Sequence, residues 1–201
     1  MKTKTYCLAM VAIALTSAGH LSAQTVTSSF EGVSPGLNVK GMFDGINAQY
    51  VNSGVMKFSD FDAFCIDPYQ GIVANQPITY NVALTFSTPE TDKAISKLVG
   101  GYYASGQSAL EAAAIQWAIW EVVVDGTNNP SLYSGNNRVF DAATAQLGQK
   151  YLSKLSELPE ANVIFLTNSR YQDMVTVVPE PSSAALFGLG VVGFLLRRKR
   201  A

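Results

Sequence analysis

Beyond residue 23, which ends an N-terminal leader predicted below, this chain contains a single cysteine, Cys65, and this limits how that part of the chain can be held together. The other cysteine, Cys7, and the only histidine, His20, both lie in the leader. An oxidising compartment normally pairs cysteines, but no internal disulfide can form here. A Cys–His dyad is excluded in the same way, and we expect no metal site at this thiol. The unpaired thiol within residues 61–68 therefore needs another explanation.

A second stretch, residues 112–121, offers a partner for this thiol. It places one carboxamide, Gln116, in an otherwise apolar run that includes alanines and two tryptophans. On a helix, Trp120 lies four residues further on and shares the face of Gln116. The plain interpretation of Gln116 is a buried amide bonded to a neighbouring backbone group. The plain interpretation of Cys65 is a small apolar core residue, as free cysteines often are.

Taken together, the two stretches resemble the thioester domain found on bacterial surface proteins. Residues 64–67 (Phe-Cys-Ile-Asp) match that family's motif of an aromatic residue, Cys, an aliphatic residue and Asp. Residues 115–120 (Ile-Gln-Trp-Ala-Ile-Trp) match its aliphatic-Gln-x-x-aliphatic-Trp motif. The resemblance implies that Cys65 and Gln116 join as an internal thioester with loss of ammonia. A thioester is a stored electrophile, so the fold must align both groups and exclude water.

Three further residues are candidates for supporting such a site. The resemblance suggests that Asp67 positions or polarises the site, while a turn residue before Pro68 is an equal alternative. Trp120 could cover the thioester, and with Trp117 it could also be an ordinary core aromatic. Asp67 belongs to an acidic stretch whose spacing does not match an EF-hand loop, so we expect a solvated acidic strand face and no calcium site.

The N-terminal 23 residues carry the features of a secretory signal peptide. Lys2 and Lys4 form a basic end, residues 6–15 form an apolar run, and residues 21–23 (Leu-Ser-Ala) form a small-residue cleavage site. We expect the mature chain to begin near Gln24.

The C-terminal segment, residues 178–201, carries a second set of targeting features. Val-Pro-Glu-Pro at 178–181 precedes an uncharged run at 182–196 and the basic cluster Arg-Arg-Lys-Arg at 197–200. The uncharged run of 15 residues is short for a membrane span, which needs roughly 20. This tail resembles the PEP-CTERM sorting signal of Gram-negative bacteria, which implies handling by an exosortase, a membrane cysteine protease. A plain membrane anchor is the alternative.

The charge of the mature region excludes one class of partner. Residues 24–178 contain eight Lys and Arg against fourteen Asp and Glu, a net charge of −6. An acidic domain without a basic patch argues against nucleic-acid binding. No cofactor is expected from the sequence.

The order of predicted elements indicates an α+β fold. We expect strands at 55–58, 61–66 and 78–86, with a hairpin turn at 51–55. Helices should follow at about 88–100, 108–123 and 138–158, with closing strands at 163–166 and 173–178. This predicts a β-sandwich or barrel-like arrangement of strands at both ends and a helical insertion that carries Gln116. The predicted domains are a signal peptide (1–23), a thioester-like domain (24–177) and a sorting signal with a short transmembrane segment (178–201).

Two functions of different classes fit these observations. The first is an exported surface or matrix protein that captures a partner covalently, through attack of an amine on the Gln116 acyl carbon. A protein lysine or an amino sugar would supply the amine, and the sorting tail suggests extracellular polysaccharide or biofilm surroundings. The reaction is single-use, so we do not expect an enzyme. The alternative is a non-reactive matrix protein of the same fold with a free Cys65.

Overall fold

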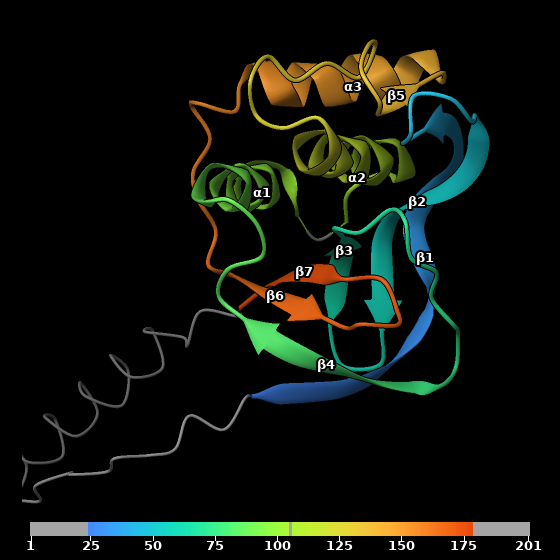
Figure 1. The fold of residues 1–201 in the computed structure, drawn as a ribbon, viewed down its shortest axis with the longest axis vertical. Helices are drawn as coiled ribbons and strands as arrows, with labels where there is room; N and C mark the ends of the chain where they lie inside the picture. The colour runs from blue at the N-terminus through green and yellow to red at the C-terminus, as the bar shows by residue number, and fades with distance from the viewer. Residues whose placement is uncertain (1–23, 105, 179–201) are drawn as a thin grey trace, which may run out of the picture.

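The structure, a computed structural model, describes residues 24–104 and 106–178, and these form a mixed α+β domain (Figure 1). The predicted signal peptide at 1–23 and all but the first residue of the predicted sorting tail at 178–201 lie outside the described residues. Within the described ranges, no helix is both long and apolar enough to cross a membrane.

The strands form an antiparallel sheet whose pairings return to their starting point. The hydrogen-bonded order is β2-β3-β7-β6-β4-β1-β5, and β1 also pairs with β2. This closure is possible because β1 is long enough to serve two neighbours: residues 25–29 pair with β4, and residues 30–41 pair with β2. The strands are β1 (Thr25–Met42), β2 (Gln49–Phe58), β3 (Asp62–Cys65), β4 (Pro77–Ala83), β5 (Arg138–Val139), β6 (Val163–Thr167) and β7 (Met174–Val177).

The predicted hairpin turn at 51–55 is wrong, because these residues lie inside β2. The chain instead reverses at 43–48, where Asp44 accepts the backbone N–H groups of Ile46 and Asn47. Gly54, which suggested a turn, has a φ of +151° and faces the backbone of Pro35 and Gly36 on β1. The missing side chain of Gly54 therefore allows β1 and β2 to approach closely near an irregularity in their register.

Three helices lie together on one side of the strands (Figure 1). They are α1 (Pro89–Tyr102), α2 (Ala109–Val124) and α3 (Ala142–Ser153). Thr88 caps α1 with Pro89 following it, and Ser108 and Glu111 form a capping box at the start of α2, both as predicted. The third helix is shorter than the predicted 138–158, because Val139 pairs with Gly41 of β1 and Asp141 then caps the helix.

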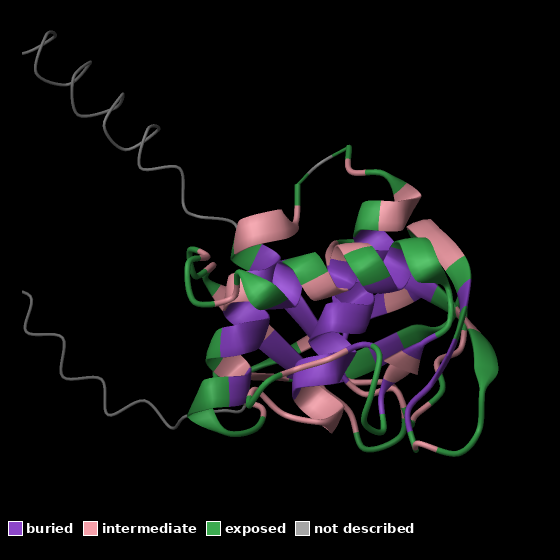
Figure 2. Cartoon of the chain, turned by 90° about the horizontal axis from the view of Figure 1, so that it is seen from above, coloured by how far each residue is buried: buried purple, intermediate pink, exposed green. Residues whose placement is uncertain are grey.

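Helix α2 lies at the centre of the domain and is buried on every face from Ala112 to Val122. It contacts α1 and α3 on one side and β1, β2 and β3 on the other. Figure 2 shows the buried residues gathered in this interior, with exposed residues on the outer faces of the helices and in the loops. Gly148 of α3 faces the Ala114 carbonyl, which lets the two helices pack closely. A helix without a polar face can be stable only in such a position.

Candidate functional site

Cys65 is the last residue of β3 and is 2% exposed. On one side β3 pairs with β7, where Cys65 lies opposite Met174 and the Ile66 N–H donates to the Asp173 carbonyl at 2.9 Å. On the other side the pairing with β2 covers only Asp62 and Ala63. Beyond Ala63, β2 forms no hydrogen bonds with the backbone N–H and C=O of Cys65, so these buried groups require other partners.

Gln116 of α2 supplies both partners. The Cys65 backbone N–H donates to Gln116 Oε1 at 3.0 Å, and Gln116 Nε2 donates to the Cys65 carbonyl oxygen at 2.7 Å. The two residues are 51 positions apart in the chain, and the Gln116 side chain is buried, with a residue exposure of 1%. The structure thus brings together the two residues that the sequence motifs singled out. The strand end and the central helix hold them from rigid elements.

The sulfur of Cys65 is a buried, protonated thiol at neutral pH. Its Sγ donates to the Asp67 carbonyl oxygen at 3.2 Å, and the thiol is free of any disulfide. Burial raises the pKa of the Cys65 thiol to about 12, and the Trp120 side chain and the backbone at Asp67 oppose that rise. The raised pKa follows from the cost of placing a thiolate in an apolar interior.

The two tryptophans of the motif have different environments. The Trp117 Nε1–H donates to Ser53 Oγ at 3.1 Å, and its ring stacks on Phe43 at 4.9 Å between centroids. The Trp120 Nε1–H is buried and has no hydrogen-bond partner among the described residues in this protonated state. Trp117 is therefore a satisfied core aromatic, whereas Trp120 brings an unused donor to the wall beside Cys65 and Gln116.

The Asp67 side chain belongs to the turn after β3. Its Oδ1 accepts the backbone N–H of Tyr69 at 2.9 Å, and it is the Asp67 backbone carbonyl, not the carboxylate, that contacts the sulfur. The other acidic residues of this stretch have separate partners. Asp62 pairs with Lys57 at 2.5 Å and accepts the Tyr103 hydroxyl at 3.0 Å, while Asp60 accepts from Ser28 Oγ at 2.8 Å. The carboxylates do not converge on one point.

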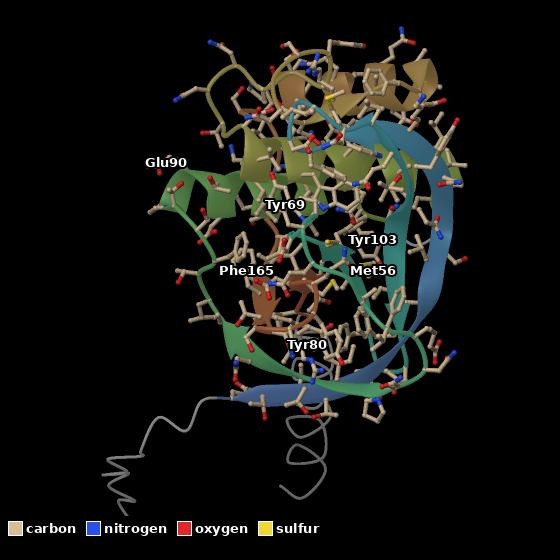
Figure 3. The ribbon with its side chains drawn as sticks, turned by 45° about the vertical axis from the view of Figure 1, so that its right-hand side comes forward. Met56, Tyr69, Tyr80, Glu90, Tyr103 and Phe165 are labelled. Carbon is tan, nitrogen blue, oxygen red and sulfur yellow. The ribbon has the colours of Figure 1, made fainter. Side chains whose placement is uncertain are left out.

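A cavity of about 280 Å³ adjoins the Cys65–Gln116 pair. Its wall is mainly apolar, with polar side chains from Asn52 and Gln172. One of the apolar lining residues, Met56 of β2, is labelled in Figure 3. Sequence reasoning identified only the motif residues on this wall, because the rest come from β1, β2 and loops that are distant in the chain. The lining residues are Phe30, Gly32, Val33, Val51, Asn52, Gly54, Met56, Cys65, Ile72, Gln116, Trp120 and Gln172.

A larger hollow of about 640 Å³ lies elsewhere, between α1, α3 and the loop at 127–130. It is an open surface depression that includes Lys93, Lys97 and Gln149, and none of the motif residues lines it. The motif residues Cys65, Gln116 and Trp120 instead line the smaller cavity.

Comparison with known proteins identifies the tail of the chain. A family model described as the PEP-CTERM protein-sorting motif matches residues 177–200. The chain carries a PEP-CTERM motif. This confirms the predicted sorting signal and indicates an exported protein that is sorted by exosortase. No curated protein and no solved structure matches the chain, and the predicted thioester domain is not supported by any match. The PEP-CTERM match says nothing about the chemistry of residues 24–176.

Proposed function

We propose that the exported domain carries an internal thioester between Cys65 Sγ and Gln116 Cδ and uses it to capture an amine-bearing partner covalently. The observation that carries this proposal is the pair of hydrogen bonds, 3.0 and 2.7 Å long, that holds the buried Gln116 amide against Cys65. The thiol and the amide are the two groups that the reaction needs, and both are shielded from water.

The contacts of the amide suit the bond-forming step. Attack of Sγ on Cδ forms the C–S bond and breaks the C–N bond, and Nε2 leaves as ammonia after taking the thiol proton. Negative charge develops on Oε1 during this attack. The Cys65 backbone N–H already donates to Oε1 at 3.0 Å, so it would stabilise that charge without reorganisation.

Capture of a partner is a second substitution at the same carbon, in which sulfur is now the leaving group. A neutral amine attacks the same carbon, the C–S bond breaks, and the product is an amide on Gln116 with a free Cys65 thiol. The cavity of about 280 Å³ beside the pair gives a small nucleophile a route to the carbon. The protein is consumed once per capture, so it acts as a covalent binder and not as an enzyme.

The sorting signal gives this binder a setting. Because exosortase handles the tail, the domain is presented outside the cell, where a protein lysine or an amino sugar of the extracellular polysaccharide is a suitable nucleophile. A covalent bond to such a partner would serve adhesion or matrix attachment. The net charge of −6 on residues 24–178 fits neither nucleic acid nor an anionic surface as partner.

A second function is favoured by a separate feature of the same contacts. Both polar atoms of the Gln116 amide are already satisfied by the Cys65 backbone, so the buried amide is stable without any reaction. In this case the domain is a non-reactive matrix protein, and Gln116 only ties α2 to the end of β3.

The intact mass of the exported protein distinguishes the two functions. A thioester makes the mature chain lighter than its sequence by one ammonia, and methylamine adds its own mass to that species. Cys65→Ala should have the mass of its sequence and should not react. A wild-type mass equal to the sequence, unchanged by methylamine, would overturn covalent capture and leave the matrix role.

A further inference from the structure

Among the described side chains on the wall of this cavity, the indole N–H of Trp120 is the one buried donor without a hydrogen-bond partner. Trp120 is 2% exposed, and its Nε1 has no hydrogen-bond partner in residues 24–104 and 106–178. Buried N–H groups are nearly always paired, so an orphaned one in a candidate site calls for a functional explanation. Trp117, one turn earlier, shows the ordinary arrangement, because its N–H is bonded to Ser53.

The position of the Trp120 ring is fixed by its neighbours. It packs edge-on against Phe43, with 4.9 Å between centroids and an interplanar angle of 82°, and against Trp117 at 5.1 Å and 89°. Trp120 lines the same cavity as Cys65 and Gln116, and it lies four residues after Gln116 on α2. The ring, which lines the same cavity as Cys65 and Gln116, is therefore held in place by its aromatic neighbours.

The acceptor that suits this N–H is the sulfur in its anionic form. The thiol proton of Cys65 is directed to the Asp67 carbonyl, so the sulfur does not depend on Trp120 while it is protonated. The Trp120 side chain lowers the pKa of the Cys65 thiol against the effect of burial, which means that the indole favours the thiolate. Among side chains, it is Trp120 that has this effect.

We propose that Trp120 donates its indole N–H to the Cys65 sulfur as the C–S bond breaks. This rests on the proposed thioester. As the amine forms its C–N bond to Gln116 Cδ, the electron pair of the C–S bond passes to Sγ, and the proton lost by the amine ends on Sγ. A thioester sulfur is a poor acceptor, so the hydrogen bond gains its strength only as charge develops, which lowers the barrier.

The test replaces the N–H while keeping the shape of the ring. Trp120 is replaced by β-(3-benzothienyl)alanine, in which sulfur takes the place of the indole N–H, and Trp120→Phe serves as a second variant. The same benzothienyl replacement at Trp117, whose N–H is bonded to Ser53, controls for the loss of an indole N–H elsewhere on α2. The measurement is the rate at which methylamine adds to each full-length mature protein, followed by intact mass.

The expected result is that both Trp120 variants still form the thioester, while methylamine opens it at least about ten times more slowly, the usual effect of one hydrogen bond to a charged group. Across amines of similar size, the rate should also depend more steeply on amine basicity, because departure of the sulfur has become harder. A merely structural role for Trp120 would not change that slope.

Three results would overturn the inference, and they differ in whether the thioester itself is also lost. Wild-type rates and slope in a benzothienyl variant that has lost ammonia would overturn the role of Trp120 and leave the thioester intact. A wild-type protein that has not lost ammonia would overturn the thioester and, with it, this role. An equal slowing in the Trp117 control would also count against a specific role for Trp120.

Discussion

The Gln116 side-chain amide forms with the Cys65 backbone the two hydrogen bonds that a neighbouring strand would otherwise form. Its Oε1 accepts the Cys65 N–H at 3.0 Å and its Nε2 donates to the Cys65 carbonyl at 2.7 Å, on the edge of β3 that β2 has left after Ala63. The amide thus continues the sheet by one pair of hydrogen bonds and fixes the central helix to it. This arrangement stabilises the fold whether or not the two side chains react.

Removal of the Gln116 amide should destabilise the domain even where no thioester can form. In a Cys65→Ala background, Gln116→Met keeps the side-chain length but leaves the N–H and C=O of residue 65 buried and unpaired. We expect the free energy of unfolding to fall by about 2–4 kcal/mol, from two lost partners at about 1–3 kcal/mol each with partial relaxation. Denaturant unfolding of the single and double variants measures this difference. An equal midpoint would show that these bonds have no structural role.

The Cys65 thiol, once released by methylamine, should resist alkylation in the folded protein. Its pKa is raised to about 12 by burial, so the thiolate is scarce at neutral pH. Because the folded pKa is raised, this group adds stability below the pKa of an unfolded cysteine and loses that contribution as the pH rises through the folded value. Iodoacetamide should therefore modify the protein only after denaturant is added. Rapid labelling of the native form would contradict the buried position.

Glu121 should make the stability of the domain sensitive to acidic pH. It is a buried carboxylate on α2 that accepts the Ser131 N–H at 2.6 Å and the Asn137 amide at 2.9 Å, and burial raises its pKa above the ordinary 4.5. A carboxyl with a raised pKa binds its proton more tightly when folded, so its contribution is largest below pH 4.5 and is lost as the pH rises through the folded pKa.

The measurement for Glu121 compares wild type with Glu121→Gln from pH 7 downward. Relative to the variant, the wild type should gain stability as the pH approaches 4.5, and thermal unfolding at each pH follows the difference. At neutral pH Glu121→Gln should still be less stable than wild type. The Ser131 N–H and the Asn137 amide each use one carboxylate oxygen, whereas an amide offers only one acceptor atom. A difference that does not vary with pH would contradict the raised pKa.

Gly54 should not tolerate a side chain, because a Cβ there would meet Pro35 O and Gly36 Cα on β1 and the φ of +151° disfavours other residues. We expect Gly54→Ala to cost at least about 1–3 kcal/mol of stability. Gly71→Ala is the matched control, since nothing lies within 4 Å of a Cβ at that position. If both variants unfold at the wild-type temperature, the strands are not in close contact at Gly54.

Sequence reasoning succeeded where a local or paired signal was present. The caps at Thr88 and Ser108 depend on residues within one turn. Two motifs indicated Cys65 and Gln116, which are in contact across 51 residues, while the thioester between them stays a prediction. The false hairpin at 51–55 shows the limit of such signals. A glycine that relieves a contact between strands carries the same sequence signature as one that makes a turn.

The different environments of the two tryptophans were out of reach for a related reason. Trp117 and Trp120 belong to one motif, and the Trp117 N–H is satisfied because Ser53 of β2 lies within hydrogen-bonding distance of it, whereas the Trp120 N–H has no partner in the described residues. The cavity wall likewise comes from β1, β2 and the loop before β7, and its composition depends on long-range pairing. These features follow from tertiary structure and not from any short pattern.

Narrowing the cavity should slow large nucleophiles more than small ones, if it is the route to the thioester. Val33, on β1, is partly buried and lines the cavity, so Val33→Trp should restrict its opening without touching the Cys65–Gln116 hydrogen bonds. We expect the thioester still to form and methylamine to open it within a few fold of the wild-type rate. A peptide with a single lysine should react with the Val33→Trp variant at least about ten times more slowly than with wild type. Steric rejection of a poorly fitting group commonly changes a rate by about this factor. Thr127→Trp, in the separate hollow between α1 and α3, is the control. Equal slowing of both amines would indicate a general disturbance of the fold, and unchanged rates for both would place the route of entry elsewhere.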